Sequence, residues 1–107
     1  MPADGVGRLT VSVRHASGCA TVEIAGELDM ATAPLVDEQT KQLQRQGATE
    51  LCLDTSGVEF IDSSGLLALL TLADAVDRMG ATLRPTGASS AVRRVVEITG
   101  LHQFIPP

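Results

Sequence analysis

Alternating hydrophobic and polar residues near the N-terminus predict two strands. Residues 9–14 alternate with period two, which is the pattern of a half-buried strand. The sequence Ala-Ser-Gly at 16–18 predicts a turn, and residues 21–25 resume the alternation. Two such strands joined by a short turn favour an antiparallel hairpin. Residues 1–7 are small and polar, and we expect them to be frayed.

The next segment predicts a helix followed by a buried strand. Thr32 is a suitable N-cap, Pro34 suits the first helical turn, and Gly47 is a natural C-terminal stop. The apolar run at 51–53 is consistent with a short buried parallel strand. We expect residues 54–61 to form a loop.

The second half of the chain repeats this alternation. A long helix is predicted to begin within residues 62–65 and to end at Met79, before Gly80. Residues 81–84 predict a further strand, which we expect Pro85 and Gly87 to break.

The C-terminal segment predicts one more helix and one short strand. Ser89 or Ser90 caps the helix, Gly100 stops it, and residues 102–107 form the strand. The order β-β-α-β-α-β-α predicts an α/β fold with a mixed, mainly parallel sheet covered by helices. A chain of 107 residues is long enough for one domain, so we expect residues 1–107 to form it.

Charge and composition argue against a nucleic-acid or membrane partner. Eight basic residues face thirteen acidic ones, and Phe60 and Phe104 are the only aromatic residues. Nucleic-acid binders need a positive surface, and single-strand binders also need stacking rings. No stretch approaches the ~20 apolar residues of a membrane span, and residues 1–9 lack the apolar core of a secretory signal. We therefore expect a soluble, cytoplasmic protein.

The two cysteines and the acidic loop match no metal or cofactor motif. Cys19 and Cys52 fall in predicted strands, where a buried free thiol is favoured over redox chemistry. Asp54, Glu59 and Asp62 could in principle hold a metal, but their spacing matches no dedicated site. The sequence therefore predicts no metal and no cofactor.

Two segments distant in sequence should meet at one edge of the sheet. Residues 26–29 and 54–65 both leave strands at the carboxyl edge, where functional groups gather in open α/β sheets. Ser63 stands at a helix start, whose backbone N–H groups suit an anion such as phosphate. The simpler alternative is that Asp62, Ser63 or Ser64 is only an N-cap.

Leu67 falls on the side of the long helix opposite its predicted core face. A single exposed leucine needs no explanation, yet one helical turn from Ser63 it could contact a partner, and the sequence leaves both interpretations open. The residues assigned to the core face are Leu66, Leu69, Leu70, Leu72, Ala73 and Val76.

Motifs for enzymatic chemistry are missing from the sequence. The phosphate-binding patterns Gly-x-x-x-x-Gly-Lys-Ser/Thr and Gly-x-Gly-x-x-Gly are absent, as is the nucleophile elbow Gly-x-Ser-x-Gly. His15 and His102, the only imidazoles, are expected at a strand end and near the C-terminus. We therefore expect the protein not to be an enzyme.

Four separated segments carry a family resemblance. They are residues 26–29 (Gly-Glu-Leu-Asp), 53–54, 58–66 and 92–101, and the most specific part is Phe-Ile-Asp-Ser-Ser-Gly-Leu. Together they resemble the STAS domain of bacterial anti-sigma factor antagonists, over roughly residues 8–105. One departure is Leu67, where family members often carry glycine.

The resemblance implies a STAS-like single domain and a partner-switching function. Such an antagonist binds an anti-sigma factor, typically a serine kinase, and thereby frees a sigma factor for transcription. The kinase phosphorylates the serine directly after the aspartate, which is Ser63 here, and a serine phosphatase restores binding. We expect the partner-binding residues to be Asp29, Asp62, Ser63, Ser64 and Gly65, which lie in the matching motifs, and Leu67, which is included for its position on the helix.

Two alternatives remain open at the level of the sequence. Within the same fold, the chain could be a STAS subunit of a lipid-transport complex or of a stressosome-like assembly, with Ser63 never modified. In a different class, it could be a small nucleotide-binding or hydrolytic protein that uses the carboxyl edge of the sheet.

Overall fold

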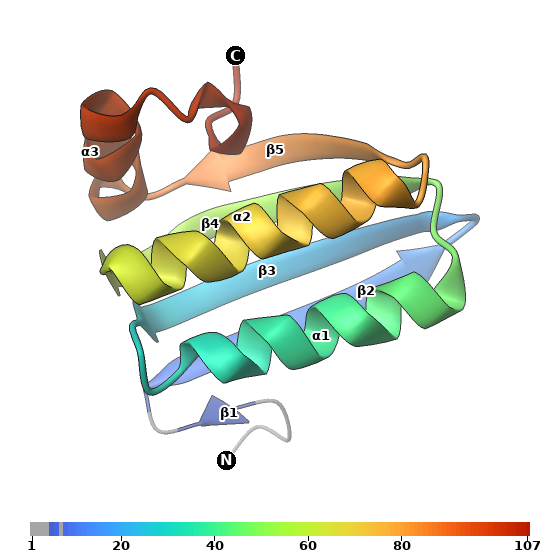
Figure 1. The fold of residues 1–107 in the computed structure, drawn as a ribbon, viewed down its shortest axis with the longest axis horizontal. Coiled ribbons are helices and arrows are strands. Elements are labelled where there is room, and N and C mark those ends of the chain that lie inside the picture. The colour runs from blue at the N-terminus through green and yellow to red at the C-terminus, as the bar shows by residue number, and fades with distance from the viewer. Residues whose placement is uncertain (1–4, 7) are drawn as a thin grey trace.

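A computed structural model describes residues 5–6 and 8–107, and side chains from residue 8 onward. Within this part of the chain, five strands form one sheet in the order β1-β2-β3-β4-β5. Figure 1 shows α1 and α2 side by side over the same face of this sheet, with α3 beside its β5 edge. The strands are β1 (Gly5–Val6), β2 (Leu9–Ala16), β3 (Cys19–Leu28), β4 (Glu50–Ile61) and β5 (Thr82–Ala88). The helices are α1 (Ala33–Gln46), α2 (Ser63–Arg78), α3 (Ser90–Thr99) and the 3-10 helix η1 (His102–Phe104).

The predicted fold class is confirmed. β2 and β3 form the antiparallel hairpin, while β3 with β4 and β4 with β5 are parallel pairs. β1 adds an unexpected short antiparallel pairing, because Gly5 and Val6 lie opposite Thr10 and Leu9. These two residues are therefore not frayed, whereas residues 1–4 and 7 lie outside the described residues.

The core lies between the sheet and the layer of α1 and α2. Along β3, Ala20, Val22 and Ile24 are buried and alternate with half-buried residues on the opposite face. The same alternation gives β4 its buried Leu51 and Leu53 on the helix-covered side. The other face of the sheet is free of α1 and α2 (Figure 1), and the β3 residues that face it are half-buried.

The expected loop over residues 54–61 is wrong, because β4 runs on to Ile61. Register shifts in both ladders accommodate the polar residues of this segment. Gly57 lies so close to β3 that an added Cβ would stand 2.7 Å from the Ala25 Cβ. β3 is likewise longer than expected and ends at Leu28. Pairing with a neighbouring strand, which local patterns do not reveal, therefore sets the length of both strands.

The expected break at Pro85 and Gly87 is also wrong. β5 continues to Ala88 as an edge strand, where proline is tolerated because one side of the backbone has no ladder to complete. The expected last strand over residues 102–107 is instead η1 followed by irregular chain. Its Phe104 is fully buried, so this segment packs its ring into the core and adds no strand.

The predicted helix ends are mostly confirmed. Gly47 and Gly100 adopt the left-handed conformation that ends α1 and α3. The Ser89 hydroxyl accepts a hydrogen bond from the Val92 N–H (3.1 Å), which caps α3. Thr32 occupies the N-cap position of α1 but makes no side-chain capping bond there. Its hydroxyl instead donates to the Glu27 carbonyl (2.8 Å), and it therefore joins the end of β3 to the start of α1.

Candidate partner-binding site

The two segments expected to share one edge of the sheet do so. Leu28, the last residue of β3, pairs with Ile61, the last residue of β4. Asp29 and Asp62 are therefore the first residues beyond two adjacent parallel strands. The Asp62 N–H donates to the Leu28 carbonyl (3.2 Å), which fixes the start of α2 against the end of β3.

Three polar residues, Asp62, Ser63 and Ser64, stand at the start of α2, and Asp62 is the one that caps the helix. Its carboxylate Oδ1 accepts a hydrogen bond from the Gly65 N–H (2.9 Å). Ser63 is the first helical residue and is exposed. Within the described residues, the Ser63 hydroxyl makes no hydrogen bond, so it is not used to hold the helix. Ser64 is half-buried in the same turn.

Gly65 lets α2 approach β3 closely. An added Cβ would lie 2.4 Å from the Leu28 carbonyl oxygen and 2.7 Å from the Leu28 Cγ. The carbonyl belongs to the sheet backbone and cannot move away without disturbing the strand. Glycine at this position therefore sets where the N-terminus of α2, and with it Ser63, meets the end of β3.

Asp29 is held rigidly in the turn between β3 and α1. Its Oδ1 accepts hydrogen bonds from the N–H groups of Ala31 (3.0 Å) and Thr32 (3.1 Å). Its Oδ2 forms an ion pair with Arg8 (2.7 Å), and Arg8 also pairs with Glu27 (3.1 Å). These contacts keep an acidic side chain in one position beside the start of α2.

The ionisation of Asp29 follows from the same contacts. Partial burial opposes the charged form, but the hydrogen bonds from Thr32 and Ala31 and the charge of Arg8 outweigh it. The pKa of the Asp29 carboxyl is therefore below its ordinary value. At neutral pH the edge of the sheet carries this carboxylate as a fixed negative charge.

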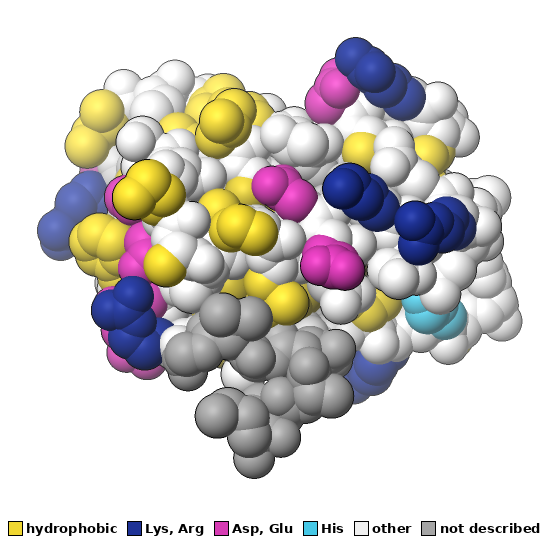
Figure 2. Space-filling model, turned by 60° about the horizontal axis from the view of Figure 1, so that its bottom comes forward, with side chains coloured by type: hydrophobic (Ala, Val, Ile, Leu, Met, Phe, Trp, Pro, Cys, Tyr) yellow, Lys and Arg dark blue, Asp and Glu magenta, His cyan; other side chains and the backbone are white. Residues whose placement is uncertain are grey.

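An apolar groove runs between α1 and α2 beside this edge. It encloses about 420 Å³ and includes Ser64 and Leu67 among its lining residues. Leu67 is 63% exposed and Met30, at the mouth of the same groove, is 76% exposed. Figure 2 shows hydrophobic side chains gathered over the end of this face where α1 and α2 begin. The remaining lining residues are Ala33, Pro34, Asp37, Lys41, Ala68 and Thr71.

Sequence analysis missed Met30 and the groove. The sequence does show that a large apolar residue, Met30, directly follows the Gly-Glu-Leu-Asp segment. Its exposure could not be predicted, because it depends on how α1 packs beside α2. The exposed position of Leu67 is as expected, since it lies opposite the buried Leu69 and Leu72. Leu70, assigned to the core from the sequence, is only half-buried at its margin.

The described histidines lie away from this edge. His15 pairs with Ala20 near the opposite end of the β2–β3 hairpin, and His102 belongs to η1. Asp54, expected in a carboxyl-edge loop, lies within β4, where its carboxylate accepts from the Ser56 N–H (2.9 Å) and hydroxyl (2.6 Å).

Comparison with known proteins agrees with this geometry. A family model described as "Mlab, STAS domain" matches residues 11–106. This chain belongs to the STAS-domain family. The STAS domain is 33% identical over 98 residues to an anti-sigma-B factor antagonist of Bacillus subtilis, covering 91% of this chain and 88% of that protein. It is 31% identical to the anti-sigma-F factor antagonist RsfB of Mycobacterium tuberculosis, covering 89% and 77% of the two chains.

A solved structure has the same fold. The crystal structure of an anti-sigma factor antagonist from Mycobacterium paratuberculosis superposes on this STAS domain with a TM-score of 0.78 at 28% identity. The alignment covers 98% of this chain and 86% of that one. Among the described helices of the STAS domain, none has the length and apolar character needed to cross a membrane.

Proposed function

We propose that this STAS domain is an anti-sigma factor antagonist switched by phosphate on Ser63. In its unmodified form it binds an anti-sigma factor, itself a serine kinase, and so releases a sigma factor for transcription. Phosphorylation of Ser63 by that kinase ends the complex, and a serine phosphatase restores it. The protein acts by binding and not as an enzyme, and its place of action is the cytoplasm.

The observation that carries this proposal is the state of Ser63 at the start of α2. Because Asp62 caps the helix, the Ser63 hydroxyl is exposed and not committed to the fold. A kinase can therefore reach it without unfolding the helix. The names of the relatives support the same role, since they are antagonists of anti-sigma factors.

The contact surface combines an apolar groove with a charged rim. Met30 and Leu67 offer exposed apolar area, which can be buried against a partner. Asp29 and Asp62 lie at the adjoining edge, where Asp29 is fixed by its turn and Asp62 by its cap. Ser63 stands at this rim beside Ser64 and Gly65, so a phosphate there meets any partner that covers the groove.

Affinity capture from the native cell tests the proposal. Unmodified and Ser63→Ala baits should retain a protein kinase, and a Ser63→Glu bait should lose it. In the absence of the bait, the same kinase should bind a sigma factor. The captured kinase with ATP should then phosphorylate the wild-type chain. Peptide mass mapping should place the phosphate on Ser63.

Ser64→Ala is the matched control for the phosphorylation step, because Ser64 belongs to the same helical turn. Since Ser64 also lines the groove, only its phosphorylation on Ser63 should match that of the wild-type chain. Substantial phosphate on the Ser63→Ala chain would contradict the assignment. Baits that all retain a lipid-transport or stressosome-like assembly, whatever stands at position 63, would favour a STAS subunit that is not phosphorylated.

A further inference from the structure

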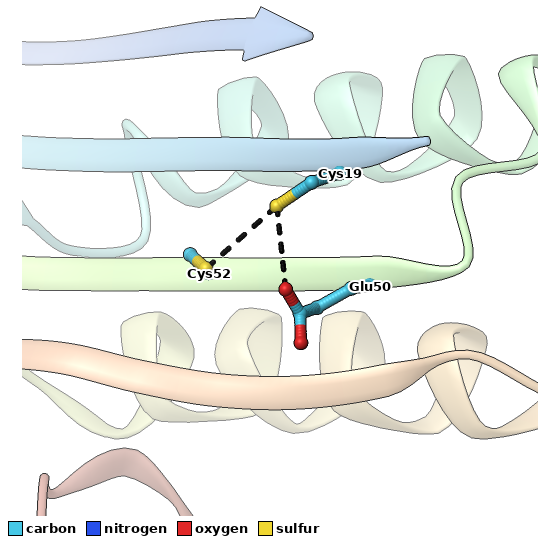
Figure 3. A group of neighbouring side chains, drawn as sticks. All are labelled: Cys19, Glu50 and Cys52. Atoms are coloured by element: carbon cyan, nitrogen blue, oxygen red, sulfur yellow. Dashed lines mark hydrogen bonds between the residues drawn. The ribbon is translucent and has the colours of Figure 1, made fainter. Parts of the chain in front are cut away.

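A cluster of two thiols and one carboxylate lies at the other end of the sheet. The Cys19 Sγ is 3.8 Å from the Cys52 Sγ and 3.6 Å from the Glu50 Oε1. One ligand atom from each of the three residues lies within 4.8 Å of the others. Figure 3 shows Cys19, at the start of β3, turned toward Cys52 and Glu50 on β4. Along their strands these residues alternate with the core residues Ala20 and Leu51, so the cluster lies on the sheet face opposite α1 and α2.

These distances fit a tetrahedral metal centre. Zn²⁺ binds thiolate sulfur at about 2.3 Å and carboxylate oxygen at about 2.0–2.2 Å. Two such sulfurs at the tetrahedral angle stand about 3.8 Å apart, and a sulfur and an oxygen stand about 3.6 Å apart. The Cys19–Cys52 and Cys19–Glu50 distances agree with both values. The Cys52 and Glu50 ligand atoms lie within 4.8 Å of each other, and binding one ion would bring them to about 3.6 Å.

We propose that Cys19, Glu50 and Cys52 form a binding site for a thiophilic divalent cation of the Zn²⁺ class. The three residues supply three ligands, and a water molecule completes the tetrahedron. Two thiolates and a carboxylate match the soft and borderline ligands that such an ion selects over Mg²⁺ or Ca²⁺. Binding releases the thiol protons to solvent.

Arg84 on β5 completes the charge balance of the site. Its guanidinium donates to the Glu50 Oε1 (3.3 Å) and lies 3.6 Å from the Cys52 Sγ. Three anionic ligands and a dication leave one negative charge, which Arg84 offsets. An arginine that hydrogen-bonds to two of the ligands is also in the position of the outer groups that orient metal ligands in proteins.

A disulfide between the same cysteines fits the register less well. Cys19 pairs with Glu50 and Cys52 pairs with Thr21, so the cysteines are diagonal neighbours on parallel strands. Such positions place the Cα atoms about 8 Å apart, given a strand spacing near 4.8 Å and two residues of rise. Unstrained disulfides need roughly 4.4–6.8 Å.

The site is remote from the partner-binding edge. Cys19 begins β3 and Leu28 ends it, which separates the two by about 30 Å of strand. The ion would tie the first residues of β3 and β4 together without touching Ser63. It therefore acts on the stability of the domain and leaves the proposed switch free to operate.

Titration of the reduced, full-length protein with Co²⁺ tests this site. Co²⁺ replaces Zn²⁺ in tetrahedral sites and reports thiolate ligation by a near-ultraviolet charge-transfer band and strong visible bands. We expect one equivalent to bind, added Zn²⁺ to bleach the bands, and Zn²⁺ to raise the melting temperature. Cys19→Ser should weaken Co²⁺ binding by roughly 100-fold or more, since even the loss of an outer-shell group costs about 10–100-fold.

Matched variants keep the test decisive. Cys19 is half-exposed, so Cys19→Ser should fold, which circular dichroism verifies. Glu50→Gln should weaken binding, and Glu23→Gln, on the same face of β3, should not. No charge-transfer band, or an equal Zn²⁺ effect on melting in Cys19→Ser, would overturn the proposal. The proposal would also be overturned, in favour of a redox pair, if the metal-free protein bound no Co²⁺ and mild peroxide oxidised the thiols of both Cys19 and Cys52.

Discussion

The Asp29 carboxylate shows how one residue can order a whole turn. It accepts two backbone hydrogen bonds and pairs with Arg8, and its pKa lies below the ordinary value of 3.8. A depressed carboxyl pKa contributes stability that is present above the unfolded-state pKa and lost as the pH falls through the folded-state pKa. The contribution of Asp29 is therefore complete at neutral pH.

We expect Asp29→Asn to lower the free energy of unfolding at pH 7. The deficit relative to wild type should shrink as the pH is lowered below about 4, where the wild-type carboxyl also loses its charge. Urea unfolding at a series of pH values measures both effects. Asp77→Asn, at an exposed position on α2, is the control for the loss of one surface charge. A deficit that stays constant down to acid pH would contradict the argument.

The close approach of Gly65 to Leu28 leads to a second prediction, on the stability of a Gly65 variant. Gly65→Ala should destabilise the protein by about 1–3 kcal/mol, as overpacking of a well-packed site does. The added methyl group would meet the Leu28 carbonyl, although alanine is the better helix former. Denaturant unfolding checks this, with Ser64→Ala as the neighbouring control. A Gly65→Ala protein more stable than wild type would show that α2 can shift freely.

At the scale of the element, α2 has one buried face and one exposed face, and we propose that the exposed face contacts the partner. Leu69→Ala should cost about 2–5 kcal/mol, because Leu69 is fully buried. Leu67→Ala should change stability by no more than about 0.5 kcal/mol, because Leu67 is mostly exposed. Only the Leu67 variant, still folded, should weaken partner binding. Chemical denaturation and titration calorimetry test the pair, and unchanged affinity in Leu67→Ala would remove the groove from the interface.

Helix ends were predictable because the residues that define them are local. Ser89 caps α3, and Gly100 ends it through its own backbone conformation. The extent of β4 was not predictable in this way, since residues 54–61 contain the polar and glycine residues typical of loops. Their hydrogen bonds go to β3 and, in part, to β5. Only the register between distant segments reveals this, and the same holds for the edge strand through Pro85.

At the scale of the whole molecule, topology predicts which segments meet but not their detailed contacts. Parallel strands end at a common edge, and this rule is enough to bring Asp29 and Asp62 together from the order of the elements. The approach of Cys19 to Cys52 depends on a diagonal register and on side-chain rotation, which the sequence does not specify. The groove around Met30 depends on the packing of α1 beside α2.

Phosphorylation of Ser63 should have little effect on the stability of the domain. A phosphate on Ser63 adds about 1.5–2 negative charges at neutral pH. The N-terminus of α2 favours such a charge by about 0.3–1 kcal/mol. The carboxylates of Asp62 and Asp29 oppose it, so the net change in the free energy of unfolding should be small. Because Ser63 is exposed, the phosphate also displaces no packed group.

Binding should respond far more strongly than stability. A partner that covers the rim must either desolvate the phosphate or keep its distance, and like charges across an interface can cost several kcal/mol. Every 1.4 kcal/mol corresponds to about tenfold in affinity. Protein carrying phosphoserine at position 63, made by genetic incorporation, should therefore melt within a few degrees of the unmodified chain but bind the captured anti-sigma factor at least tenfold more weakly. Thermal melts and calorimetry on the same samples compare the two quantities. Local charge and bulk on an intact surface would leave the melting temperature nearly unchanged. A fall in melting temperature large enough to explain the lost affinity would instead mean that the switch works by unfolding the start of α2.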